Sequence, residues 1–338
     1  MSFLPLAPTD IVVSADSITA PAWSTGLPVL TSFVSASSTA PQFYVDVYAS
    51  GSTTTDSTPQ FSIAYGHLYG SGSTYYNQNV QYITPTRTTY GQYRTLVYGD
   101  ENTNFNFGTG NTVARDIIVI NVNRNRYKDQ LFLSTFNLTL SGSTNLKLTN
   151  NSNDVTTVKY LDCGRAFDIV SGSNGSATTT PIAAGVTAGY TPSGSYGLYL
   201  PDVGLIVLNP RALALAPASG GINLSISETN NVNSYNYRST YNAISGGANF
   251  QLNSEETVSS DYVFVRVKSQ DCNYTTNPSI ISGSGILNFP SLINNPQTYI
   301  TTVGLYNTNN ELLAVAKLSK PLVKDFTKEA LIKVKLNW

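Results

Sequence analysis

The chain has 338 residues, of which 41% are hydrophobic but only 12% are charged, and its formal net charge is −1. This length and apolar content suffice for two or three packed domains and exclude a disordered chain. The near-neutral charge excludes a strong overall electrostatic field that would attract nucleic acid or anionic membranes. No stretch approaches the roughly 18–20 apolar residues of a membrane span. We therefore expect no nucleic-acid partner and no membrane insertion. The start MSFLPLAPTDIVVS does not resemble a secretory signal, and the lone Cys163 and Cys272 favour reduced thiols, so we expect folding in a cytoplasm.

Polar residues that favour strands and turns take the place of the missing charges. Tyr alone occurs 22 times, and Ser, Thr, Asn and Gly are abundant. Tyr and Thr suit pleated surfaces, whereas Gly, Asn and Ser favour turns. The composition therefore predicts an all-β, multi-domain protein of β-sandwich-like antiparallel sheets. Long polar loops and at most one or two short helices should complete it.

Alternating patterns predict strands along the first half of the chain. In QFYVDVYAS (42–50), Phe43, Val45 and Val47 point to one face and the intervening residues to the other. QFSIAYGHLYG (60–70) and FNLTLSG (136–142) alternate in the same way, and the continuous apolar run 117–122 predicts a central strand buried on two sides. The segment 84–99 places Tyr90 and Val97 at helical spacing and is the best candidate for a short helix, although a strand remains an alternative.

The second half alternates strand patterns with polar stretches. Strands are expected at 157–161, 203–208, 222–227 and 261–268. The Ser/Thr/Gly-rich stretch 171–197 predicts either a flexible connection or an arm ordered against another chain, and 228–256 predicts a protruding loop. These patterns suggest an N-terminal β-domain (1–150), a middle segment (151–220) and a C-terminal β-domain (221–338).

The closing segment predicts paired strands. Tyr299–Tyr306 and Glu311–Leu318 form a hairpin pattern across Asn307–Asn310, and Pro321 should end its second strand. Residues 331–338 alternate as a last strand, which we expect to be ordered and paired, with Trp338 packed against the domain or a neighbouring chain.

Chemistry-bearing residues are sparse. His67 is the only histidine, Cys163 and Cys272 stand alone, and neither a phosphate-binding loop nor a zinc motif occurs. The loop DENTN (100–104) has oxygen ligands but lacks the spacing of a calcium-binding EF-hand. We therefore expect a protein that is not an enzyme and uses no cofactor or metal, with His67 structural or at the surface.

Two basic clusters are candidate contact regions. In NRNRYKDQ (123–130), basic residues surround Tyr127, which suits a nucleic-acid backbone, a salt-bridged rim or a subunit contact; we favour the last two. Residues 1–86 lack Lys and Arg, whereas 311–338 hold six Lys, which indicates either a solvated face or docking between neighbouring copies. The interface candidates are Arg124, Arg126, Tyr127, Lys128, Lys333, Lys335 and Trp338.

Three stretches resemble one family. FSIAYGHLYGSGS (61–73), TPTRTTYGQYRTLVYG (84–99) with RDIIVINVNRNRYKDQL (115–131), and SGSYGLYLPDVGLIVLNPRAL (193–213) resemble a virion structural protein of T4-like contractile-tailed bacteriophages of marine and cyanobacterial hosts. The closing segment from Thr301 is similar to a module of phage baseplate and tail-fibre-attachment proteins, although Asn307–Asn310 replaces a tighter Asp-Gly turn.

The resemblance implies a non-enzymatic structural component of a phage tail, at the baseplate, as a wedge or peripheral part. Such a protein would contact other tail proteins and copies of itself in the virion, after assembly in the bacterial cytoplasm. The alternative is a receptor- or glycan-binding protein at the tail tip that contacts the host surface through Tyr235, Tyr237 and Tyr241. A glycan depolymerase is a third reading.

Overall fold

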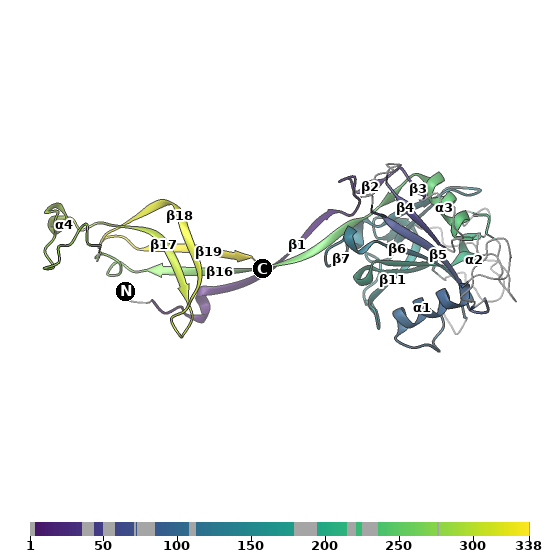
Figure 1. Cartoon of the computed structure of the whole chain (residues 1–338), viewed down its shortest axis with the longest axis horizontal. Coiled ribbons are helices and arrows are strands. Elements are labelled where there is room, and N and C mark those ends of the chain that lie inside the picture. Colours follow the sequence, from purple (N-terminus) through teal and green to yellow (C-terminus); the bar gives the residue numbers. More distant parts are fainter. Residues whose placement is uncertain are drawn as a thin grey trace. The chain divides into compact units, whose positions relative to one another are not determined.

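The computed structural model describes residues 4–35, 44–49, 58–70, 72, 85–107, 113–178, 195–214, 221–224, 236–275 and 277–337. The chain forms two compact units. The terminal unit combines Met1–Ser17 with Thr257–Trp338, and the central unit is Ile18–Glu256 (Figure 1). This division differs from the three consecutive segments expected from the sequence. The reason is that the first strand pairs with a strand more than 200 residues later, which brings both ends of the chain into one unit.

Strands dominate the described residues, which confirms the all-β fold. They are β1 Ile11–Pro21, β2 Val29–Leu30, β3 Val34–Ser35, β4 Tyr44–Tyr48, β5 Phe61–His67, β6 Asp116–Val122, β7 Gln130–Leu131, β8 Asn137–Leu140, β9 Leu146–Asn150, β10 Lys159–Leu161, β11 Gly164–Ser173, β12 Ser176–Ala177, β13 Gly197–Leu200, β14 Leu205–Leu208, β15 Phe250–Gln251, β16 Asn253–Val267, β17 Thr298–Tyr306, β18 Leu312–Lys324 and β19 Ala330–Asn337. The α-helices are α1 Thr86–Tyr98, α2 Pro210–Ala214, α3 Asn236–Gly247 and α4 Ser291–Asn294, four rather than the one or two expected.

One large antiparallel sheet forms the central unit. Its strands follow the order β2-β15-β8-β9-β11-β13-β14-β6-β5-β4-β3, with β10 and β12 attached to β11. Strand β6 lies between β5 and β14 and is buried on both faces. Ile118 and Ile120 point into one apolar cluster, whereas Ile117 and Val119 point into another. The continuous apolar run of this strand is thus explained by two cores, one on each face of the sheet.

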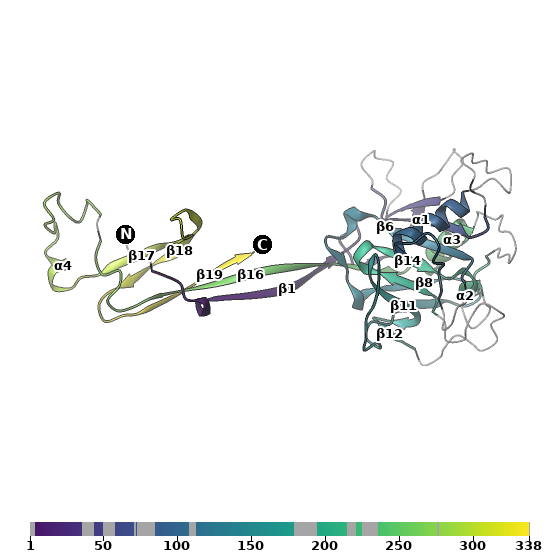
Figure 2. The ribbon, with the colours of Figure 1, turned by 90° about the horizontal axis from the view of Figure 1, so that it is seen from below.

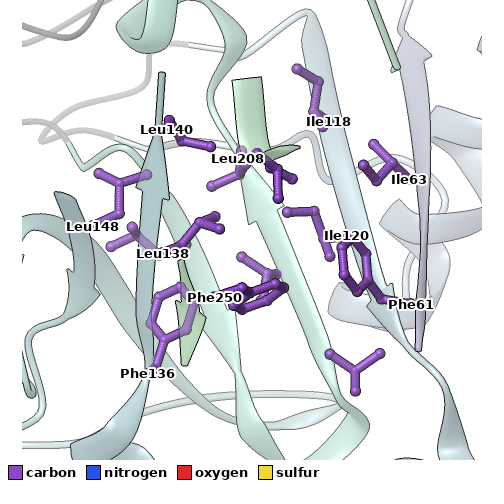
Figure 3. Close-up of a cluster of buried hydrophobic side chains, with 14 of the residues drawn as sticks. Phe61, Ile63, Ile118, Ile120, Phe136, Leu138, Leu140, Leu148, Leu208 and Phe250 are labelled. Carbon is purple, nitrogen blue, oxygen red and sulfur yellow. The ribbon is translucent and has the colours of Figure 1, made fainter. Parts of the chain in front are cut away.

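The sheet curls so that its two ends share the larger core. Strands β5 and β15 lie far apart in the strand order, yet the ring centroids of Phe61 and Phe250 are 5.2 Å apart. Trp23 packs against both rings, and its Nε1 donates a hydrogen bond to the Phe250 carbonyl at 2.8 Å. Figure 3 shows the β5 and β6 side chains facing those of Phe136, β8 and β9, with Phe250 between them. Aromatic packing therefore closes the curl.

Two helices cover the faces of this sheet. Helix α1 confirms the helix expected at 84–99, and it buries Tyr90 and Val97 in the smaller core beside β5 (Figure 1). Helix α3 packs Tyr237 and Ile244 into the larger core and contacts β8, β5 and β4. The expected protruding loop at 228–256 is therefore wrong over 236–256, where the helix and strands β15 and β16 lie.

Other predicted segments have mixed outcomes. The alternation of β4 is confirmed, since Val45 and Val47 are buried and their neighbours half-buried. The stretch 171–197 is ordered at both ends, in β11, β12 and β13, while 179–194 lies outside the described residues. Residues 222–224 belong to no strand, and the rest of the strand expected at 222–227 is outside the described residues.

The terminal unit is a small two-layer sandwich. One layer has the order β1-β16-β19 and the other is the hairpin β17-β18 (Figure 2). The layers meet at Val263, Val303 and Val334, which are at most 9% exposed. The predicted hairpin and last strand are confirmed, because β19 pairs with β16 from Ala330 to Asn337. Trp338 lies outside the described residues.

Strand β18 continues through Pro321, contrary to the expectation that this residue would end it. On the paired strand β17, Ile300 pairs with Leu322 and Thr302 pairs with Lys317. The β18 residues between Lys317 and Leu322, which include Pro321, are therefore left out of the ladder. A proline lacks the N–H needed for a ladder hydrogen bond, and an irregularity in the pairing removes the need for that bond.

A buried lysine anchors the end of β18. Lys324 is 0% exposed, and its Nζ donates hydrogen bonds to Ser269 O, Asn273 Oδ1 and Asp325 O at 2.8–2.9 Å. Three acceptors match the three protons of the ammonium group, which makes its burial tolerable. The turn that follows is held by the Asp325 carboxylate, which accepts from the Thr327 hydroxyl at 2.6 Å and contacts Lys328 Nζ at 3.0 Å.

We expect Phe250→Ala to destabilise the central unit by about 3–5 kcal/mol, because it removes the ring that joins both ends of the curled sheet. Chemical denaturation measures the loss. Tyr160→Ala, at a side chain 71% exposed, is the control and should change stability little. Equal effects of both changes would contradict this account of the core.

We expect the turn at Asp325 to make the terminal unit less stable as the pH falls into the acid range. Hydrogen bonds from the Thr327 and Lys328 side chains lower the pKa of Asp325 to about 2. A lowered folded-state pKa stabilises the fold above the unfolded value of about 4, and this contribution disappears as the pH falls toward 2. Hydrogen exchange of β18 and β19 should show wild type more protected than Asp325→Asn at pH 7, with the difference vanishing near pH 2. A pH-independent difference would refute the role of the carboxylate.

Candidate functional site

The histidine predicted to be structural lies in the core of the central unit. His67 is 0% exposed, and its Nδ1 accepts a hydrogen bond from the Tyr69 amide at 3.1 Å. Its register partner on β6 is Asp116, which forms an ion pair with Arg211 of α2 at 3.1 Å. The histidine therefore lies buried at the end of the strand pair β5 and β6, whose Asp116 contacts α2.

The oxygen-rich loop at 100–104 is closed by hydrogen bonds between its own residues. The Asp100 carboxylate accepts from the Asn102 and Thr103 amides, each at 3.0 Å, and from the Thr103 hydroxyl at 2.7 Å. These bonds lower the pKa of Asp100 and form a turn closed by the Asp100 side chain.

Other signs of reactive or metal chemistry are sparse. Within the described ranges, no group of three or more His, Cys, Asp or Glu side chains is arranged to hold a metal ion. Both cysteines are free, and burial raises the pKa of the half-buried Cys163 thiol to about 11, which disfavours the reactive thiolate. None of the helices in the described part of the chain is long and apolar enough to cross a bilayer.

The basic segment at 124–128 divides between core and surface. The Arg124 guanidinium lies 4.6 Å from the centroid of the Tyr127 ring and donates to the Tyr127 carbonyl at 2.6 Å. Tyr127 itself is 7% exposed and belongs to the larger core. Its ring lies against Gly204, whose φ is +68° and where an added Cβ would come within 2.6 Å of the ring. Tyr127 is therefore a packing residue and not the interface residue expected, because its ring fills this glycine site.

Lys128 and Arg126 form an ion pair and hydrogen bonds with other segments of the central unit. Lys128 Nζ lies 2.6 Å from Glu256 Oε2, although the lysine side chain is 70% exposed. The Lys128 amide donates to Ser254 Oγ at 2.9 Å, which fixes the segment to β16. Arg126 donates to Thr58 Oγ1 at 3.0 Å. The Lys128–Glu256 ion pair and the Arg126–Thr58 hydrogen bond form a rim of the kind that was one alternative in the sequence analysis.

An ion pair extends this rim. The Arg165 guanidinium contacts the Asp202 carboxylate through Nη2 at 2.6 Å and Nε at 3.1 Å, and it also donates to Gln130 Oε1. The hydrogen bond with Asp202 raises the pKa of Arg165. Gly164 has φ +117°, and an added Cβ there would lie 2.5 Å from Asp202 Oδ2, so the glycine allows this close approach.

The lysines of the last strand lie over aromatic rings. Lys333 Nζ is 3.9 Å and Lys335 Nζ is 5.5 Å from the centroid of the Tyr262 ring on β16. These cation–π contacts cover an aromatic surface, and both lysines remain exposed. They stay available as interface residues, unlike Tyr127.

The tyrosines proposed as a recognition loop are mostly used within the fold. Tyr237 is 1% exposed in the larger core. The Tyr241 hydroxyl donates to Phe33 O at 3.0 Å and accepts from the Ser35 amide at 3.1 Å. Tyr235 lies outside the described residues. Tyr237 is therefore a core residue, whereas Tyr241 is half-buried with its hydroxyl bonded within the fold.

Sequence reasoning missed the many exposed apolar side chains of the terminal unit. Of the large apolar side chains that are exposed, five lie in residues 4–17 and eleven in residues 257–337, against six in the central unit. Three consecutive residues of β1, Ile11, Val12 and Val13, are 45–68% exposed. Adjacent apolar residues did not reveal this exposure, because the same pattern in β6 belongs to a strand that is buried on both faces.

Comparison of the chain with models of known protein families, with curated protein sequences and with solved structures found no match.

We expect the two ion pairs of the rim to differ in their contribution to stability. Arg165→Ala should destabilise the central unit by about 1–3 kcal/mol, because it leaves a half-buried carboxylate and amide without their donor. Lys128→Ala should cost less than about 1 kcal/mol, since its side chain is mostly in water. Urea denaturation of both variants measures the difference, and a reversed order would show that the Arg165 contacts do not stabilise the fold.

Proposed function

We propose that the chain is a non-enzymatic structural component of a bacteriophage tail, placed at the baseplate, where it joins neighbouring proteins and copies of itself. The exposed apolar strands of the terminal unit are the observation on which the proposal depends. Soluble monomers rarely expose many large apolar side chains on one small unit, and surfaces of this kind are typical of protein contacts. The similarity of the closing segment to a module of baseplate and fibre-attachment proteins points to the same region of the chain.

The central unit fits the role of a rigid frame in this proposal. Its sheet has a core on each face, and its conspicuous polar groups are engaged in internal bonds, as at Arg165, Asp116 and Asp100. An enzyme would instead hold polar groups ready for a substrate in a cleft. The receptor-binding alternative loses its main support, because Tyr237 and Tyr241 pack inward.

Antibodies against the chain test the proposed location on intact particles of the phage that encodes it. Gold labels should gather at the end of the tail, and particles made without the protein should lack an assembled baseplate. Labels on the head, or particles that assemble and infect normally without the protein, would overturn the proposal. A mock-labelled sample and an antibody against a head protein serve as controls.

A further inference from the structure

The layer β1-β16-β19 of the terminal unit has two open edges. Strand β16 lies in the middle, and β1 and β19 form the two ends of the strand order, with no further partner strand among the described residues. An open edge presents unpaired backbone N–H and C=O groups, and natural proteins usually protect such edges with lysines, prolines or bulges. The part of β1 that belongs to the terminal unit, Ile11–Ser17, contains no lysine and no proline.

The two edges complement each other in charge and polarity. Within Ile11–Ser17 the only charged residue is Asp16, whereas the charged residues of β19 are Lys333 and Lys335. Both strands also expose apolar side chains, Val12 at 47% and Leu331 at 63%. Because side chains alternate along a strand, Val12 lies on the same face of β1 as Asp16, and Leu331 lies on the same face of β19 as both lysines. Opposite charges and apolar groups on neighbouring strands stabilise a sheet, whereas a strand pairing with a copy of itself would oppose like charges.

The terminal unit also has too small a core for its length. Among the described residues, its apolar side chains that are at most 9% exposed are Val263, Val267, Val303 and Val334, whereas the central unit has an extensive core on each face of its sheet. Ordering a chain costs conformational entropy that buried apolar surface must offset. A second copy of the chain, which is present wherever the chain is made, would cover further apolar side chains if it paired with these edges.

We propose that copies of this chain associate head to tail, with the β1 edge of one copy paired to the β19 edge of the next. The pairing is heterologous, so each copy uses one edge of each kind and the assembly closes into a ring if the rotation between copies permits. The inference deepens the proposed structural role by naming the partner and the surfaces. It holds equally for a self-associating protein outside a phage tail.

Cysteine pairs placed in different chains test the contact directly. In a Cys272→Ser background, chains with Val12→Cys are mixed with chains with Leu331→Cys and oxidised. We expect a mixed disulfide dimer on a non-reducing gel. Within one chain the two positions are separated by β16, at about 9–10 Å, which exceeds the roughly 7 Å limit for a disulfide. Tyr160→Cys, mixed with Leu331→Cys, is the matched control, because Tyr160 is exposed on the central unit.

Charge exchange provides a second measurement that does not depend on cross-linking. We expect sedimentation to show oligomers of the wild type at micromolar concentration. Asp16→Lys, or Lys333→Glu with Lys335→Glu, should weaken association by about tenfold or more, because like charges then face each other. Combining all three substitutions should restore it. Circular dichroism verifies that each variant is folded.

The results separate this inference from the proposed function. A monomeric wild type, or mixed cross-links no stronger than the control, would overturn the edge pairing even if antibodies find the protein on the tail. Oligomers that are insensitive to charge exchange would also overturn it. Conversely, edge pairing without any label on the particles would remove the tail role and leave the self-association.

Discussion

The contact between Phe61, Phe250 and Trp23 is the constraint on which the central unit depends. A sheet this large has to hide both faces, and its strands come from segments far apart in the chain. The aromatic group joins one end of the strand order to the other and leaves the larger core enclosed. Helix α3 then packs over that core, and Tyr127 fills the position beside Gly204. The ion pairs of the rim depend on this arrangement, because they join segments whose positions the core has already fixed.

Local periodicity predicted the strands well, because each pattern records burial on one or two faces. Strand β4 with Val45 and Val47, and β6 with its continuous apolar run, are examples. Helix α3 was missed because its sequence is rich in Asn and Ser, which favour turns. Its buried Tyr237, Thr240 and Ile244 nevertheless lie at i, i+3 and i+7, the helical spacing. This helical spacing was the signal for the helix, but the polar composition of the segment as a whole favoured a loop.

The pairing of distant segments could not be predicted from one sequence. Trp23 and Phe250 are 227 positions apart, and the patterns around them specify strands without specifying partners. The same holds for β1 and β16, whose pairing places both ends of the chain in one unit. Of the interface candidates, the lysines at 333 and 335 remain exposed, while Tyr127 is packed inside, because an aromatic residue suits both a contact surface and a core.

The division of the terminal unit between two distant segments has a consequence for synthesis. The ribosome delivers β1 first, but its partner β16 and the last strand β19 emerge only after the whole central unit. Domains generally fold as they emerge, so the central unit can fold while β1 waits unpaired. Under the proposed association, the β19 edge therefore becomes available only after the central unit has been made. Strand β1 meanwhile remains an unpaired edge, a state that exposes a folding chain to aggregation.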